Sequence, residues 1–362
     1  VGLYAGNSLN RWDKLDAKTS ANKFRKTRKD ESGIENKGIV NIWGGRNSKN
    51  NDLGVTGLLV TFGTLKNEGK VAVDHGVAMM ATDGSIISNK NGGKVIASGI
   101  YQIGHQGTNV TKRTTESGAT GENYGIVGIS DTGYTYNIKP NGALDNSLTL
   151  THENSSIYAA GDLAVGIYAE NRNNTPANSN VTVDFTNQTS ASGSTGIDVR
   201  NDKAENKDNG ARGVGIALVN GKGSTQGGVI KLTGADDGTL LGAAGASAGT
   251  TPTMSNSVPT SSFFTAFDIG KNDILTGKNG IGIYAENADI KVNSPKFTVL
   301  TKDNGVGLWA MDNTVVASNS SNAGVAGAHD KTFQYNYNGA NDKNGFAMAF
   351  GGKQGQTTAI NN

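Results

Sequence analysis

The stretch VGIYAEN at residues 165–171 returns as IGIYAEN at residues 281–287. In this phrase an apolar residue and a glycine are followed by an isoleucine, a tyrosine and an alanine. Looser copies lie at residues 1–7, 76–81, 214–220, 306–312 and 345–350. Recurrence of one short phrase along a chain indicates a repeat architecture, in which each copy takes the same place in successive structural units. The phrase therefore decides the fold.

The glycines of the pattern set the length of one repeat. Successive intervals are 19, 19, 23 and 26 residues, for Gly38, Gly57, Gly76, Gly99 and Gly125. One coil of a β-solenoid needs about three strands of 4–6 residues plus corners, which fits this spacing. The sequence therefore predicts an all-β fold, a parallel β-helix with loop insertions. About 14 coils, each about 4.8 Å high, would make a column about 65 Å long.

The segments between the phrases alternate apolar and polar residues, as strands with one buried face do. Residues 180–185 (NVTVDF) and 228–232 (GVIKL) are examples. Asn-Gly pairs tolerate positive φ and predict corners; they begin at residues 91, 141, 209, 220, 279, 304, 338 and 344. Glycine in the phrase is expected where stacked backbones are crowded. One face should carry an aromatic ladder of Tyr4, Tyr168, Tyr284 and Trp309.

Composition excludes several classes of protein. The 362 residues include 52 glycines and 5 prolines, and charged residues make up 18%, which matches neither a compact enzyme nor a charged disordered tail. A formal net charge of +2 argues against nucleic-acid binding, which depends on clustered Lys and Arg. The absence of cysteine rules out disulfides, thiol chemistry and Cys-ligated zinc. No apolar run is long enough to predict a membrane helix.

Two long intervals do not fit the repeat and predict insertions that loop out from the column, and residues 104–123 and 200–212 predict shorter polar insertions. Residues 8–33 are rich in Lys, Arg and Asp, and residues 233–274 are rich in Ala, Gly, Thr and Ser. Loops on a rigid scaffold often carry recognition, so the candidate partner-binding residues are the aromatic residues of these insertions, Trp12, Phe263, Phe264 and Phe267. The alternative for the phenylalanines is packing back onto the column, because Phe is usually buried.

No motif supports a catalytic, cofactor or metal site. GASAG at residues 245–249 has the letters of a nucleophile elbow but lacks the strand and helix that position the serine. The histidines are far apart and form no ligand pair, so they are expected on the surface or in turns; they are His75, His105, His152 and His329.

Carboxylates converging from consecutive coils would indicate a polysaccharide lyase or hydrolase, because β-helices of that kind carry such sites on one exposed sheet. The acids expected to be exposed are Asp74, Asp83, Asp184 and Asp289. Their recurrence is too irregular to predict an active site.

With its Asn-Gly corners and polar insertions, the phrase resembles the passenger domains of very large type V (Va) autotransporter adhesins, particularly those of fusobacteria. The resemblance covers most of the chain and rests on the style of the repeat. It implies that the β-helix is right-handed and that residues 1–362 are a single segment of a longer passenger domain. It also implies an extracellular place on the bacterial surface, with a secretion signal and a C-terminal outer-membrane β-barrel that both lie outside this sequence.

The same resemblance implies a non-catalytic adhesin segment, a virulence factor without a cofactor. Its partners would be a host-cell receptor or glycan, or the surface of another bacterium. No binding residue transfers from the family, because no binding motif matches position by position. Two alternatives stay open: a β-helical polysaccharide lyase or hydrolase, and a structural spacer whose binding is carried elsewhere in the full protein.

Overall fold

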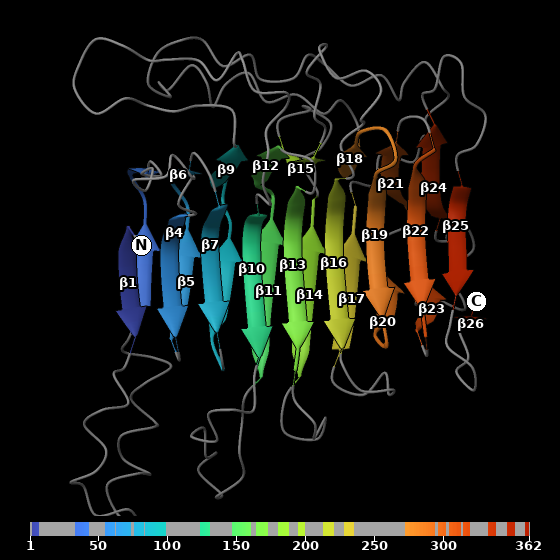
Figure 1. Cartoon of the computed structure of the whole chain (residues 1–362), viewed down its shortest axis with the longest axis horizontal. Coiled ribbons are helices and arrows are strands. Elements are labelled where there is room, and N and C mark those ends of the chain that lie inside the picture. The colour runs from blue at the N-terminus through green and yellow to red at the C-terminus, as the bar shows by residue number, and fades with distance from the viewer. Residues whose placement is uncertain are drawn as a thin grey trace, which may run out of the picture.

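A computed structural model of the chain describes residues 2–6, 33–42, 55–61, 63–73, 76–82, 84–98, 124–130, 147–160, 164–172, 180–187, 195–199, 213–220, 228–234, 272–293, 296–301, 304–312, 314–318, 332–337, 346–351 and 359–361. Every regular element in these residues is a β-strand. The strands form three parallel sheets, here called A, B and C. Within each sheet the strands of successive coils lie side by side, so that the sheets are the faces of one column (Figure 1).

Sheet A contains the repeat phrases. Its strands, in the order in which neighbours are hydrogen-bonded, are β1 (Leu3–Gly6), β4 (Val55–Thr61), β7 (Gly76–Thr82), β10 (Tyr124–Ser130), β13 (Val165–Asn171), β16 (Val214–Asn220), β19 (Ile281–Glu286), β22 (Val306–Met311) and β25 (Phe346–Gly351). The two nearly identical phrases thus form β13 and β19, with β16 between them.

The segments between the phrases supply the other two sheets. Sheet B is formed by β2 (Gly33–Asn36), β5 (Thr64–Asn67), β8 (Ile86–Asn89), β11 (Leu148–Glu153), β14 (Val181–Thr186), β17 (Gly228–Thr233), β20 (Asp289–Val292), β23 (Val315–Ser318) and β26 (Ala359–Asn361). Sheet C is formed by β3 (Ile39–Ile42), β6 (Lys70–Val73), β9 (Lys94–Ser98), β12 (Ser156–Ala160), β15 (Gly196–Val199), β18 (Ile274–Thr276), β21 (Lys296–Thr301) and β24 (Thr332–Tyr337).

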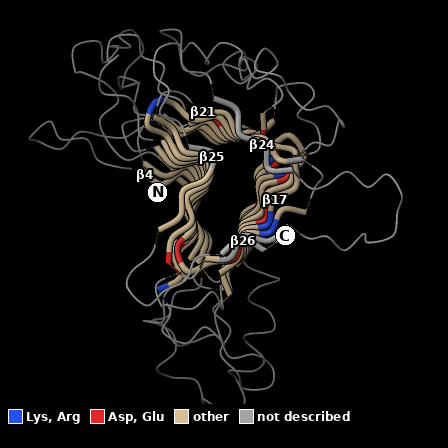
Figure 2. Tube along the Cα trace, turned by 90° about the vertical axis from the view of Figure 1, so that its right-hand side faces the viewer, with Lys and Arg blue, Asp and Glu red and all other residues tan. Residues whose placement is uncertain are grey.

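Each coil passes through sheets A, B and C in turn, and the next coil returns to sheet A beside the last. Figure 2 views the column from the end at which β25 lies. From there the chain descends sheet A at the left, rises through sheet B at the right and crosses sheet C at the top, while successive coils come toward the viewer. This path is right-handed, the usual hand for connections between parallel strands. The predicted right-handed parallel β-helix is confirmed.

The column has fewer coils than the length of the chain suggested. The described residues place nine strands in each of sheets A and B and eight in sheet C. Nine coils span eight intervals of about 4.8 Å, or about 38 Å, rather than the about 65 Å expected from 14 coils. The expectation was too high because repeats are unequal in length: Gly215 and Gly282 occupy neighbouring coils although they are 67 residues apart.

The glycine of the phrase lies where the column has no room for a side chain. A Cβ on Gly166 would stand 2.4 Å from Ile197 Cγ2 in sheet C and 2.6 Å from the carbonyl oxygen of Gly215 in the next coil. A Cβ on Gly215 would meet Ile274 Cγ2 at 2.4 Å and the carbonyl oxygen of Gly282 at 2.5 Å. Carbon atoms in favourable contact are about 3.5–4.0 Å apart. The glycine of the phrase is therefore a packing requirement of the junction between sheets C and A. Gly38 and Gly76, counted with it in the sequence, are not equivalent, because Gly38 lies between β2 and β3 and Gly76 is in register with Val55.

Inward side chains of the three sheets fill the column with apolar residues. Along β13, Ile167 and Ala169 are 1% and 0% exposed, whereas Tyr168 between them faces outward and is half-buried. This alternation is that of a strand with one face in the core. Phe185 and Phe297 are the largest fully buried side chains, and their rings meet edge to face at 5.5 Å. Burial of these apolar side chains stabilises the column, because removing apolar surface from water is the main driving force of folding.

Three asparagines inside the column are paired with one another. Asn36, Asn67 and Asn89 occupy the same inward position in three successive strands of sheet B. Asn36 Nδ2 donates to Asn67 Oδ1 at 2.7 Å, and Asn67 Nδ2 donates to Asn89 Oδ1 at 2.8 Å. A buried amide without a partner would cost about 1–3 kcal/mol. The ladder therefore lets asparagine occupy a core position.

Asparagines turn several corners, as the Asn-Gly pairs predicted. Asn91, Asn279 and Asn304 have φ angles of 52°, 56° and 56°, in the left-handed region that asparagine tolerates. Asn220 differs, because it ends β16 with a buried side chain that donates to the carbonyl oxygen of Asn287 at 2.9 Å. The pairs that begin at residues 141, 209, 338 and 344 lie outside the described residues.

Candidate functional site on the outer face of sheet A

The outward side chains of sheet A form rows along the column, because its strands are stacked in register. One of these, here called the aromatic row, contains Tyr4, Leu59, Met80, Val127, Tyr168, Ala217, Tyr284, Trp309 and Ala349. The four aromatic residues of the predicted ladder therefore share one row. The ladder is not continuous, however, because only Tyr284 and Trp309 are neighbours and other residues separate the rest.

Two further outward rows flank the aromatic row. The row before it contains Thr56, Val77, Tyr124, Val165, Val214, Ile281 and Val306. The row after it contains Thr61, Thr82, Ile129, Glu170, Val219, Glu286 and Met311. Among these described side chains only Glu170 and Glu286 are charged, and Figure 2 shows sheet A without charge over most of its height. Depletion of charged side chains is typical of the centre of an interaction surface.

Four rings on this face form two aromatic pairs. In the first pair, Tyr124 and Tyr168 have ring centroids 5.9 Å apart and planes at 68°. In the second pair, Tyr284 and Trp309 have centroids 6.2 Å apart and planes at 78°. Both pairs have the edge-to-face arrangement that aromatic rings favour. The register of β13, β16 and β19 places Ala217 between the two pairs.

Each aromatic pair has a carboxylate beside it. The Tyr168 hydroxyl donates to Glu170 Oε2 at 3.1 Å, and the Tyr284 hydroxyl donates to Glu286 Oε2 at 3.0 Å. Burial and the neighbouring carboxylate raise the pKa of Tyr168 to about 12 and raise the pKa of Tyr284 as well. Both phenols therefore remain hydrogen-bond donors at neutral pH. Glu170 also accepts from Arg172 Nε and Nη2, both at 2.8 Å.

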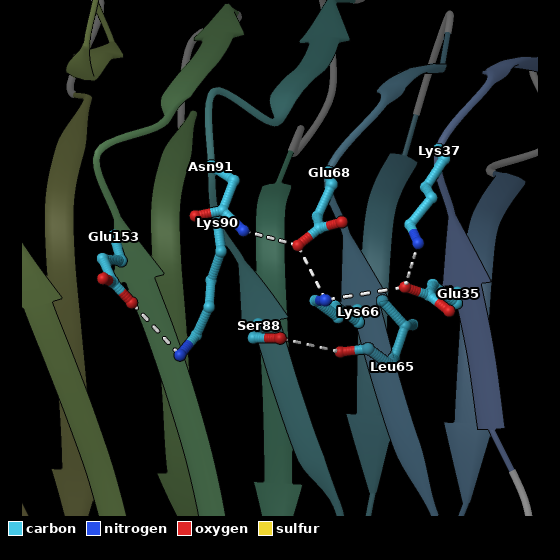
Figure 3. Close-up of polar contacts among 9 residues, drawn as sticks. All are labelled: Glu35, Lys37, Leu65, Lys66, Glu68, Ser88, Lys90, Asn91 and Glu153. Atoms are coloured by element: carbon cyan, nitrogen blue, oxygen red, sulfur yellow. Dashed lines mark hydrogen bonds and ion pairs between the residues drawn. The ribbon is translucent and has the colours of Figure 1, made fainter.

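Several charged side chains on and beside the first strands of sheet B pair with one another (Figure 3). Lys66 Nζ lies 2.7 Å from Glu68 Oε1 and 3.5 Å from Glu35 Oε1. Lys37 Nζ is 2.9 Å from the same oxygen of Glu35, and its bond holds the pKa of that carboxyl below its usual value. These ion pairs lie at the surface and are at least partly exposed, and such pairs contribute little to stability. These four side chains are matched charges and do not indicate an active site.

Of the acids expected to be exposed, the two that the structure describes do not lie together. Asp184 lies on β14 and Asp289 on β20, with β17 between them. They also stand in different outward rows, because Asp289 is in register with Val229 whereas Asp184 is in register with Lys231. Burial raises the pKa of Asp289, but no second acid is paired with it in the register. Asp74 and Asp83 lie outside the described residues.

His152 lies inside the column, which corrects the expectation of a surface or turn position. It continues the asparagine row of sheet B and is 0% exposed. Its ring stacks on Phe185 with centroids 5.0 Å apart, and its Nδ1 lies 3.4 Å from Asn89 Nδ2. Burial lowers the pKa of His152 to about 3, so the ring is neutral. Within the described residues no group of three potential metal ligands gathers around it or elsewhere.

The insertions and their candidate contact residues are largely outside the part of the chain that the structure describes. This holds for Trp12, Phe263, Phe264 and Phe267. Of the interval 8–33 only Gly33 is described, as the first residue of β2. Of the interval 233–274, residues 233–234 and 272–274 are described, and they include the end of β17 and the start of β18.

Sequence reasoning noticed the aromatic residues of the phrase but did not treat them as a site. The signal was the Tyr-Ala-Glu triplet, which occurs at residues 168–170 and 284–286. In a strand, residues two apart face the same side, so each triplet puts a phenol and a carboxylate together on the outer face.

No helix long and apolar enough to cross a membrane occurs among the described residues. Comparison of the chain with protein-family models, with curated proteins and with solved structures finds no match.

Proposed function

We propose that the chain is a non-catalytic segment of a bacterial cell-surface adhesin, of the autotransporter passenger type that its repeat phrase resembles. In this proposal the column gives reach and rigidity, and its outer surfaces make contact with a host cell or another bacterium. The observation that carries the proposal is the outer face of sheet A, where two largely apolar rows and one mixed row, with half-buried rings, run along the column.

Two physical arguments support a contact role for this face. Apolar side chains kept on the outside of a strand lose the stabilisation that burial would give, so a continuous face of them is explained by a partner that covers it. The strands that display the face are held by in-register ladders and by the packed core beneath. A rigid display surface reduces the conformational entropy lost on binding.

The enzyme alternative lacks a comparable observation. A lyase or hydrolase needs acids or bases that converge from neighbouring strands, and Asp184 and Asp289 are separated by β17. Incubating the chain with acidic and neutral polysaccharides tests this directly, because turnover of any of them would replace the adhesin proposal by an enzyme.

Attachment is tested by coating fluorescent beads with the purified chain and counting the beads held by epithelial cells and by bacteria of other species. We expect saturable attachment to at least one of these surfaces, above beads coated with heat-unfolded chain. Absence of attachment to every surface, for beads that carry folded chain, would contradict the proposal. It would instead assign the column the role of a spacer.

A further inference from the structure

We propose that the two aromatic pairs of sheet A are two stations of one binding platform for a neutral oligosaccharide. This inference rests on the proposed attachment function, because it names the class of ligand through which the chain would attach. The first station consists of Tyr124, Tyr168 and Glu170, and the second of Tyr284, Trp309 and Glu286.

The chemistry of each station matches the two kinds of surface on a sugar ring. The C–H face of a pyranose is apolar and packs on aromatic rings, and its hydroxyls need hydrogen-bond acceptors. Each station offers two rings and a carboxylate that already accepts from the tyrosine at 3.1 or 3.0 Å. A carboxylate has about four lone-pair sites, so it can accept from a sugar hydroxyl alongside or in place of its present donors.

The spacing of the stations favours an oligosaccharide over a single sugar. Tyr168, Ala217 and Tyr284 are in register on three successive strands, so the two tyrosines are two strand intervals apart, or about 9.6 Å. One pyranose in an extended chain is about as long as one such interval. The methyl of Ala217 is the smallest side chain that could stand between the rings, and it leaves the intervening sugar unobstructed.

Charge narrows the ligand to a neutral one. The described side chains of the three outward rows include two carboxylates and no Lys or Arg. Arg172, beyond the end of β13, already donates two hydrogen bonds to Glu170. A uronic acid, sialic acid or sulfated sugar would place its own negative charge beside the carboxylates of these rows. Such like-charge juxtaposition disfavours a ligand.

Binding can be followed through Trp309, because its ring contacts Tyr284 in the second station. A Trp12→Phe/Trp43→Phe chain leaves Trp309 as the only tryptophan of the three. We would titrate it with cellohexaose, chitohexaose, mannohexaose and galactohexaose, and with glucose and a sulfated hexasaccharide as references. The expected result is a saturable fluorescence change with at least one neutral hexasaccharide and none with the references.

Variants test whether the stations hold the sugar. Tyr284→Ala should weaken binding about tenfold or more, because a packed aromatic face is lost. Glu286→Gln keeps the shape and should weaken it about fivefold, because a neutral acceptor is about half as strong as a charged one. Thr182→Ala, on the outer face of sheet B, is the matched control and should bind as the parent does. Circular dichroism confirms folding of each variant.

Three results would overturn the platform. The first is the absence of a saturable fluorescence change with every neutral hexasaccharide. The second is an affinity that is unaltered in both Tyr284→Ala and Glu286→Gln. The third is a stable dimer that Tyr284→Ala disperses, since the face would then be an interface between copies. Bead attachment separates this inference from the adhesin proposal. Attachment without hexasaccharide binding removes the platform alone, and hexasaccharide binding without attachment removes the adhesin role alone.

Discussion

Replacement of Gly166 by alanine tests the stacking of the coils. The added Cβ would lie 2.4 Å from Ile197 Cγ2 and 2.6 Å from the carbonyl oxygen of Gly215. The isoleucine methyl can move slightly, but the carbonyl belongs to the backbone of the next coil and is fixed by the sheet. Overpacking of this kind costs about 1–3 kcal/mol. Ala78 occupies the corresponding position of β7, so we expect a destabilised column rather than an unfolded one.

The matched control is Gly38→Ala. There an added Cβ would have its nearest neighbour, Asn36 Oδ1, at 4.0 Å, so the free energy of unfolding should change by less than about 0.5 kcal/mol. The assay is the midpoint of urea unfolding, followed by far-UV circular dichroism. The reasoning is refuted if Gly166→Ala and Gly38→Ala unfold at the same midpoint as the parent chain.

Three further substitutions probe the interior and the surface. Asn67→Ala removes the central rung of the amide ladder and should lower the free energy of unfolding by about 1–3 kcal/mol in urea titrations; an unchanged midpoint would contradict the ladder. The pKa of His152 is about 3 in the folded chain and about 6.5 in the unfolded chain. Between these two pH values only the unfolded chain binds a proton at His152, so the free energy of unfolding should fall by about 1.4 kcal/mol for each pH unit of acidification. His152→Asn should show a shallower fall between pH 7 and 4, and an equal slope would refute the buried neutral histidine. Lys66→Ala breaks ion pairs that are partly exposed and should shift the thermal midpoint far less than Asn67→Ala does, in low or high salt.

The repeat phrase was enough to predict the parallel sheets, because a strand that must stack on its own copy in every coil needs the same residue at the same place. Gly166 and Gly215 illustrate this, because at both positions the backbone of the next coil leaves no room for a side chain. The Asn-Gly corners at Asn91 and Asn279 were predictable from local conformation, because asparagine and glycine tolerate the positive φ of these corners. Right-handedness came from the resemblance, because no local pattern in the sequence distinguishes the hand.

Other features depended on contacts that sequence spacing does not encode. Asn154 and Asp312 adopt positive φ without a following glycine, so these corners gave no Asn-Gly signal. His152 is buried because it falls in the inward row that begins with Asn36, which requires the register of four strands to recognise. The number of coils could not be read from chain length, because insertions make the repeats unequal.

The candidate site was visible in the sequence only as its parts. The Tyr-Ala-Glu triplets indicate a phenol and a carboxylate on one side of a strand. Tyr168 and Ala217 are 49 positions apart in the sequence, and Ala217 and Tyr284 are 67 positions apart. That the three residues share one face follows only once each of these distances is known to close one coil.

The most direct test of this arrangement uses the absence of cysteine from the chain. Disulfides form when Cα atoms are about 4.4–6.8 Å apart. Under mild oxidation, the pairs Tyr168→Cys/Ala217→Cys and Ala217→Cys/Tyr284→Cys should therefore cross-link, as measured by loss of free thiol in the denatured monomer. The pair Tyr168→Cys/Tyr284→Cys, about 9.6 Å apart, should keep both thiols. Cross-linking of that last pair, or free thiols in the first two, would contradict the stacked sheet and the platform built on it.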